Sequence, residues 1–193
     1  MSYAVILETD RLFLRRLTPD DAPLICDLDS DPEVMRYISK GQPTPLEKIE
    51  NEVLPRWLRL YEKHEYLGFF AAHEKASGDF IGWLCLQPDR YIPEIEIGYR
   101  LKRHVWGRGY ATEGSKALVE KAFTAWGLDR ITSHTLAVNK ASQRVMEKCG
   151  LCFQHSFTYE ESLLSGWTEE ERQGVRYGLS KGDYLRMKEG GSV

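Results

Sequence analysis

Two glycines stand two residues apart in a short basic segment, Lys102 to Gly109, between an alternating run and a helical run. Gly107 and Gly109 let the backbone approach a ligand closely, because glycine has no Cβ. When a strand is followed by a glycine loop and then by a helix, several backbone N–H groups and the helix N-terminus point at one place. The pattern therefore predicts a binding site for a phosphate group.

Other sites share part of this pattern. A dinucleotide fingerprint would need a third glycine at position 112, where Thr112 stands, and more chain after it for a doubly wound domain. A Walker loop would need a Lys-Ser/Thr pair, which this segment lacks. A Gly-rich turn beside a solvated basic cluster stays open as the alternative. That cluster comprises Arg100, Lys102, Arg103 and Arg108.

A second motif is the CxxC formed by Cys149 and Cys152, with His155 three residues on. A redox pair needs its reactive cysteine near a helix N-terminus, whereas Gly150 indicates a helix end here. A zinc site would need a second pair of closely spaced ligands, but Cys26 and Cys85 are isolated in the sequence. The five histidines show no metal-ligand spacing. We expect buried structural thiols and no metal.

The glycine loop needs a strand before it and a helix after it. Residues 94–101 alternate like a strand, and residues 110–126 place apolar side chains near one face of a helix that Gly127 stops. Helices are expected to start at Thr18 and Asp31, to cover 46–64 with a break or kink at Pro55, and to cover 139–148. Other strands are expected at 12–17, 68–73, 79–86, 130–138, 151–159 and 176–179, and the tail to residue 193 is polar.

Length and composition limit the class of protein. The 193 residues fit one domain, and the order of elements predicts an α/β (α+β) fold with a mixed sheet. A net charge of −3 argues against a nucleic-acid partner bound through bulk charge. There is no apolar run of about 20 residues, so we expect no membrane partner. The start of the chain has no basic n-region, and we expect a cytoplasmic protein.

At this point the chain resembles a known family. Residues 104–113 are similar to the acetyl-CoA loop of the GNAT N-acetyltransferases, Q/R-x-x-G-x-G/A. Residues 8–15, 31–37 and 139–151 are similar, in the same order, to motifs of the RimJ/RimL-like branch, the ribosomal-protein N-terminal acetyltransferases. Three positions depart from the pattern. His104 replaces Gln or Arg, Met146 stands where many relatives carry a Tyr general acid, and Leu151 replaces Phe.

The resemblance implies a GNAT-type fold over residues 1–193, with helices on both faces of a central sheet. The sheet would be splayed between its fourth and fifth strands, residues 94–101 and 130–138. Backbone N–H groups of residues 104–110 would hold the pyrophosphate of acetyl-CoA, and residues 99–101 would pair with its pantetheine arm. The implied cofactor-binding residues are Tyr99, Arg100, Leu101, His104, Val105, Trp106, Gly107, Arg108, Gly109, Tyr110, Ala111, Thr112, Asn139 and Ser142.

The implied reaction moves an acetyl group to a primary amine by direct attack in a ternary complex. The expected acceptor is a protein N-terminal α-amine or a small amine. An α-amine has a pKa near ~8 and a lysine near ~10.4, so the α-amine demands less of a base. Glu96 is the candidate base, with Glu94 on the same strand face in reserve; a solvent-facing carboxylate is the alternative. Ser142 is the candidate partner of the leaving thiolate, or a plain polar residue of a helix start.

Residues of the early helices would bind the acceptor. Tyr37 and Trp57 are the candidates, although aromatic residues at helical spacing are more often packing residues. Because Met146 cannot donate a proton, a non-catalytic acyl-CoA-binding module stays open as the alternative function. Either a monomer or a homodimer is compatible with the sequence.

Overall fold

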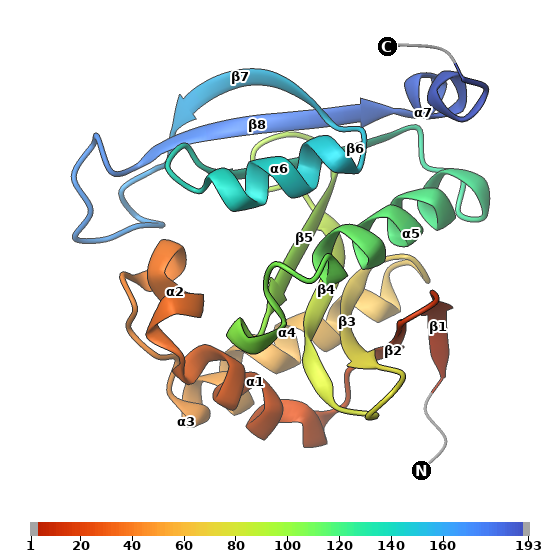
Figure 1. Cartoon of the computed structure of the whole chain (residues 1–193). Helices are drawn as coiled ribbons and strands as arrows, with labels where there is room; N and C mark the ends of the chain where they lie inside the picture. The colour runs from red at the N-terminus through yellow and green to blue at the C-terminus, as the bar shows by residue number, and fades with distance from the viewer. Residues whose placement is uncertain (1–3, 191–193) are drawn as a thin grey trace. The chain divides into compact units, whose positions relative to one another are not determined.

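The computed structural model describes residues 4–190 (Figure 1). The chain forms two compact units, and each is described by itself. The first unit comprises Met1–Gln87 and Gly98–Leu118, and the second comprises Pro88–Ile97 and Val119–Val193. The strand order is β1-β2-β3-β4-β5-β6-β8-β7, and β5 (Ile95–Leu101) contributes residues to both units. One domain over residues 1–193 stays a prediction.

The first unit contains an antiparallel meander. β1 (Val5–Glu8) pairs with β2 (Leu12–Arg16), β2 with β3 (Gly68–Glu74), and β3 with β4 (Phe80–Pro88). The last three were predicted from the sequence within two residues at each end. β1 was not predicted, because its four residues are too few to establish a period and none of them is buried.

Helices of the first unit pack on this meander. α1 (Ala22–Ser30), α2 (Pro32–Ser39) and α3 (Leu46–Lys48) lie side by side in orange (Figure 1), and α4 (Leu54–Leu58) contacts β3. The irregularity predicted at Pro55 is confirmed, because the turns before it, Ile49–Val53, are π-helical. The buried core joins these helices to the strands. It comprises Leu17, Ala22, Ile25, Leu28, Val34, Ile49, Leu54, Trp57, Phe69, Ala71, Phe80, Trp83 and Cys85.

The second unit contains the parallel pair of the sheet. β6 (Arg130–Leu136) runs parallel to β5, and the register joins Ile95 to Ile131 and Glu96 to Thr132, at the start of both strands. β8 (Gln173–Ser180) is antiparallel to both β6 and β7 (Cys152–Thr158). β7 and β8 run side by side in blue (Figure 1). The mixed sheet confirms the predicted fold class.

Each of the three remaining helices follows a strand of the sheet: α5 follows β5, α6 follows β6 and α7 follows β8. α5 (Tyr110–Thr124) ends before Gly127, which has a φ of +70°, and α6 (Lys140–Lys148) has the predicted bounds. α7 (Lys181–Lys188) lies in the tail that the sequence indicated only as polar. Tyr184 is its one buried residue and packs on Phe123 at 5.1 Å. A single buried residue makes no periodic pattern, so the sequence did not reveal this helix.

The cysteines correct one expectation. All four are free thiols, and Cys85 and Cys149 are buried as expected. Cys152 is exposed, because it begins the strand β7, whose side chains face solvent almost throughout. Within residues 4–190 there is no cluster of three or more His, Cys, Asp or Glu that could hold a metal, and no helix is long and apolar enough to cross a membrane. The absence of a metal stays a prediction.

Candidate active site

The predicted phosphate loop lies in the first unit, between β5 and α5. A 3-10 turn, Arg103–Val105, leaves the strand, and Trp106 to Gly109 lead into the helix. Gly107 has a φ of +73° and Gly109 a φ of +84°, a left-handed conformation that side chains disfavour. Among the described residues, no hydrogen bond engages the N–H groups of Gly107, Arg108 and Gly109. These donors, with the N-terminus of α5, fit an anion such as a pyrophosphate.

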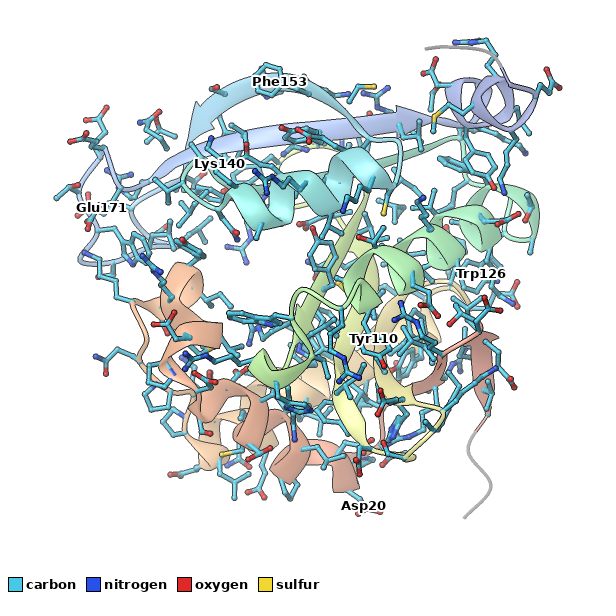
Figure 2. The ribbon with its side chains drawn as sticks, viewed as in Figure 1. Asp20, Tyr110, Trp126, Lys140, Phe153 and Glu171 are labelled. Carbon is cyan, nitrogen blue, oxygen red and sulfur yellow. The ribbon has the colours of Figure 1, made fainter. Side chains whose placement is uncertain are left out.

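Both ends of this loop are attached to the first unit. The indole N–H of Trp106 donates to the Leu101 carbonyl at 2.8 Å, and the side chain of Val105 is buried. At the other end Tyr110, labelled in Figure 2, is buried at the start of α5, and its hydroxyl donates to Glu74. The open segment between these anchors is the part with unengaged N–H groups.

Arg11 connects the loop to the turn between β1 and β2. Its Nη1 donates to the Arg108 carbonyl at 2.9 Å, its Nε donates to Glu113 at 2.6 Å, and its guanidinium lies 4.4 Å from the centre of the Tyr110 ring. Burial raises the pKa of Glu113, but hydrogen bonds from Thr9 and Arg11 outweigh burial, so the pKa is below its ordinary value. Arg11 was quoted only as part of the family motif, and its bond to the loop was not foreseen.

Some residues of the basic cluster are held in ion pairs, and others are exposed. Arg100 pairs with the buried Asp29 at 2.5 Å, and Lys102 pairs with Asp27 at 2.6 Å. Arg108 is 3.8 Å from Glu74 and is largely exposed. Arg103 and His104 are exposed in the 3-10 turn. The positive charge that faces solvent at the loop therefore comes from Arg103 and Arg108, and from His104 when it is protonated.

A groove in the first unit adjoins the start of the loop. Its walls come from the end of α1, the start of α2 and residues 102–104. The carboxylates Asp27 and Asp31 and the apolar Leu28 and Val34 line it. Early helices and the start of the loop therefore share one groove, and its use by an acceptor stays a prediction.

Asn139 and Ser142 lie in the second unit, at the start of α6, where Figure 2 labels Lys140. The Asn139 Oδ1 accepts from the Ser142 N–H at 3.2 Å, so Asn139 is the helix cap. Its amide group donates to Thr135 Oγ1 at 3.2 Å. Met146 is buried on the same helix and offers no proton. The contacts of Asn139 and Ser142 with a cofactor stay predictions.

Glu96 is buried in the second unit beside a histidine. Its Oε1 lies 3.2 Å from Nε2 of His134, and Nδ1 of His134 lies 2.7 Å from the Tyr159 hydroxyl. Glu94, the reserve candidate, pairs with Arg130 at 3.1 Å. The alternative of a solvent-facing carboxylate does not describe Glu96. The sequence analysis missed His134 and Tyr159, although the expected neighbouring strands 94–101 and 130–138 were a signal for the first.

A buried ion pair adjoins this group. Arg176 Nη1 donates to Asp89 Oδ2 at 2.5 Å, and Thr132 Oγ1 donates to the same oxygen at 3.0 Å. Burial raises the pKa of Asp89, but hydrogen bonds from Arg176, from the Tyr91 N–H and from Thr132 outweigh burial and keep the pKa below its ordinary value. Asp89 thus stays charged and neutralises Arg176, the cross-strand partner of His134.

The two predicted acceptor contacts differ in their surroundings. Trp57 is buried in the core of the first unit, where it stacks on Phe69 with ring centres 3.9 Å apart. This position is that of a packing residue. Tyr37 is half-buried on α2, with the Arg36 guanidinium 5.2 Å from its ring centre. A contact between the acceptor and either residue stays a prediction.

The sheet, the glycine loop and the following helix define a class of acyl-group transferases. Residues 11–152 match the family model described as an acetyltransferase (GNAT) domain. A relative from Aspergillus fumigatus, named FsC-acetyl coenzyme A-N(2)-transacetylase, is 32% identical over 94% of this chain and 79% of its own length. The chain belongs to the GNAT acetyltransferases, in the RimJ/RimL-like family.

Solved structures share the fold. A ribosomal-protein-S5-alanine acetyltransferase from Vibrio fischeri has a TM-score of 0.70 and 16% identity, over 92% of this chain and 97% of that one. A spermidine N-acetyltransferase from Vibrio cholerae, in complex with CoA and spermine, has a TM-score of 0.69 and 19% identity, over 92% and 99%. The family match, not these structures, makes the chain an acetyl-CoA-dependent N-acetyltransferase.

Proposed function

We propose that this enzyme acetylates a protein N-terminal α-amine of the ribosomal-protein type, with a small amine as the second candidate. The observation that carries the proposal is the loop with two left-handed glycines and unengaged N–H groups at the start of α5. Support for the acceptor comes from the RimJ/RimL-like motifs and from chemistry, because an α-amine loses its proton more readily than a lysine.

Each predicted residue then has a defined task. Backbone N–H groups of residues 104–110 bind the pyrophosphate of acetyl-CoA, which supplies the activated acetyl thioester. Backbone of residues 99–101 pairs with the pantetheine arm, and the Asn139 side chain contacts an amide of that arm. A backbone N–H near Tyr99 stabilises developing negative charge on the thioester oxygen.

Glu96 takes the proton from the acceptor ammonium, directly or through a water. Its burial supports this task, because a buried carboxylate is shielded from bulk solvent. Ser142 donates a hydrogen bond to the leaving thiolate, since Met146 cannot. The amine attacks the acetyl group directly, and no covalent enzyme adduct forms.

A second candidate acceptor has its own support. The relative with 32% identity is named for transfer to an N(2) position, and one structural neighbour is named for spermidine. In the groove beside the loop, Asp27 is paired with Lys102, and Asp31 is the further carboxylate in the lining that suits a cationic small amine. The proteins compared are named for three different acceptors: an N(2) position, spermidine and the alanine of a ribosomal protein. An acceptor panel therefore decides between the two candidates.

The deciding experiment is an acceptor panel. The wild-type enzyme is incubated with acetyl-CoA and a peptide with a free N-terminal alanine, the same peptide with a blocked N-terminus and one lysine, or spermidine. Products are identified by mass spectrometry, because a thiol reagent would also react with the exposed Cys152. We expect acetylation of the free N-terminus and none of the blocked peptide. Acetylation of spermidine alone would replace the first candidate with the second.

A further inference from the structure

Glu96, His134 and Tyr159 form a line of contacts within the second unit. The three residues come from β5, from β6 and from the segment directly after β7. The parallel register pairs Glu96 with Thr132, so His134, two residues on, projects from the same face of the sheet. Strand pairing therefore places this histidine beside the predicted base.

The hydrogen bond with Tyr159 determines the tautomer of His134. Burial, and next the negative charge of Glu96, raise the pKa of Tyr159, so its hydroxyl keeps the proton. Within residues 4–190, His134 Nδ1 is the hydrogen-bond partner found for that hydroxyl. With the hydroxyl proton directed at this partner, Nδ1 is assigned as the acceptor, and a neutral ring then carries its proton on Nε2, the nitrogen that faces Glu96.

The contact between His134 and Glu96 is close but imperfectly aligned. Nε2 is 3.2 Å from Oε1, yet this buried nitrogen has no partner with hydrogen-bond geometry in the described part of the chain. A buried donor without a hydrogen bond is destabilising and is rare enough to need an explanation. A small rotation of the Glu96 carboxylate would complete this hydrogen bond. Catalytic hydrogen bonds are often poorly aligned without a ligand and tighten when the ligand binds.

We propose that His134, held by Tyr159, is a positioning residue for the Glu96 carboxylate. This inference rests on the proposed role of Glu96 as base. In that step an N–H bond of the acceptor ammonium breaks, its proton bonds to a carboxylate oxygen of Glu96, and the electron pair stays on the nitrogen. His134 keeps its own proton on Nε2 and holds the carboxylate toward the acceptor.

Other groups around His134 leave Glu96 as its charged partner. Arg176 lies opposite on β8, but its charge is matched by Asp89. The rings of Tyr91 and Phe157 lie 5.7 and 5.9 Å from the imidazole and exclude water from it. His155 is exposed on β7 and has no contact with Glu96 among the described pairs. It provides a matched control histidine.

The first test measures the tautomer without any acceptor. Imidazole ¹⁵N chemical shifts, assigned to His134 by their loss in His134→Phe, distinguish a proton on Nε2 from one on Nδ1. We expect the Nε2–H form in the wild type and a mixture of tautomers in Tyr159→Phe, which loses only a hydroxyl. An Nδ1–H ring in the wild type, or a spectrum unchanged by Tyr159→Phe, would overturn the inference.

The second test uses the alanine peptide and spermidine as acceptors. His134→Phe should lower kcat roughly tenfold, which is only part of the ~10²- to 10⁴-fold that a base contributes, and should leave the KM for acetyl-CoA unchanged. Tyr159→Phe should act in the same direction, and His155→Phe should match the wild type. Because His134 acts through Glu96, adding His134→Phe to Glu96→Gln should cause no further loss.

The outcomes separate the two proposals. If Glu96→Gln is impaired and the histidine change multiplies that loss, His134 acts independently and the inference alone fails. If Glu96→Gln matches the wild type, the role of Glu96 fails and the inference fails with it. A wild type that acetylates neither acceptor contradicts the proposed acceptors, and the ¹⁵N spectrum still decides the tautomer. Circular dichroism of each variant confirms folding.

Discussion

In the proposed mechanism, single side chains carry out the proton transfer. Glu96 is buried and faces a histidine, whereas Glu94, which directly precedes β5, is paired with Arg130. Two carboxylates that the sequence could rank only by position thus differ in their surroundings. The difference favours Glu96 as the base, because the Glu94 carboxylate is held by the Arg130 guanidinium.

Glu96→Gln should lower kcat/KM for the amine by about 10²-fold near neutral pH, the lower end for positioned proton transfer. The loss should shrink as pH rises, since more acceptor is then already a free amine and needs no base. Affinity for acetyl-CoA should not change. The measurement is kcat/KM against pH for wild type, Glu96→Gln and Glu94→Gln. A larger loss in Glu94→Gln would move the base to that residue.

At the scale of elements, the loop and the strand turn beside it act together. Arg11 donates to the loop carbonyl of Arg108 and pairs with Glu113 on α5, so the turn between β1 and β2 supports the open N–H groups. A lysine offers no planar fork and cannot make these bonds together. Replacing Arg11 should therefore make the loop less well ordered and weaken cofactor binding, without changing the rate of the chemical step.

Arg11→Lys should raise the KM for acetyl-CoA roughly 3- to 10-fold at unchanged kcat, since a hydrogen bond contributes about 0.5–1.5 kcal/mol. Glu113 has a lowered pKa, so the support is complete above the ordinary value of 4.5 and is lost only as pH falls below it. Lys75→Gln breaks another surface pair of the first unit, with Glu8, and is the control. Equal KM values for Arg11→Lys and Lys75→Gln would contradict this role.

Sequence reasoning succeeded where the signal is local. The spacing of Gly107 and Gly109, the helix start at Tyr110 and the cap at Asn139 are all readable within a few residues, and the structure has each of them. His134 reaches Glu96 across the β5-β6 pair, and Tyr159 reaches His134 through the strand order β6-β8-β7, so both contacts join segments distant in sequence. The pairing of Arg100 with Asp29 is equally non-local. Such contacts have no local pattern from which to predict them.

For the molecule as a whole, the buried pair of Asp89 and Arg176 links the segment before β5 to β8. Arg176→Met should lower the free energy of unfolding by about 3–5 kcal/mol at neutral pH, because it leaves a buried carboxylate without its partner. Replacing both residues, as in Asp89→Leu with Arg176→Met, should cost less than the single change. Urea unfolding followed by tryptophan fluorescence measures both values.

The pH dependence of this effect has a defined sign. In the wild type the pKa of Asp89 is lowered, so the stability that it provides is present above the ordinary value of 3.8 and is lost as pH falls through the lowered value. In Arg176→Met the burial remains and the lowering contacts from Arg176 are gone. Acidification should therefore reduce the difference in the free energy of unfolding between the variant and the wild type. A difference in the free energy of unfolding that grows on acidification would contradict this explanation.

The central claim is that the loop of Gly107 and Gly109 binds acetyl-CoA, and calorimetric titration tests it most directly. A β-branched residue strains the left-handed backbone of Gly109, at φ +84°, and blocks the close approach of a phosphate. Gly78, at φ +79° in the hairpin of the same unit, has no atoms near an added Cβ, so Gly78→Val carries the same strain away from the loop. We predict that wild type and Gly78→Val bind acetyl-CoA with equal affinity, and that folded Gly109→Val gives no binding heat. Wild-type affinity in folded Gly109→Val would contradict the account.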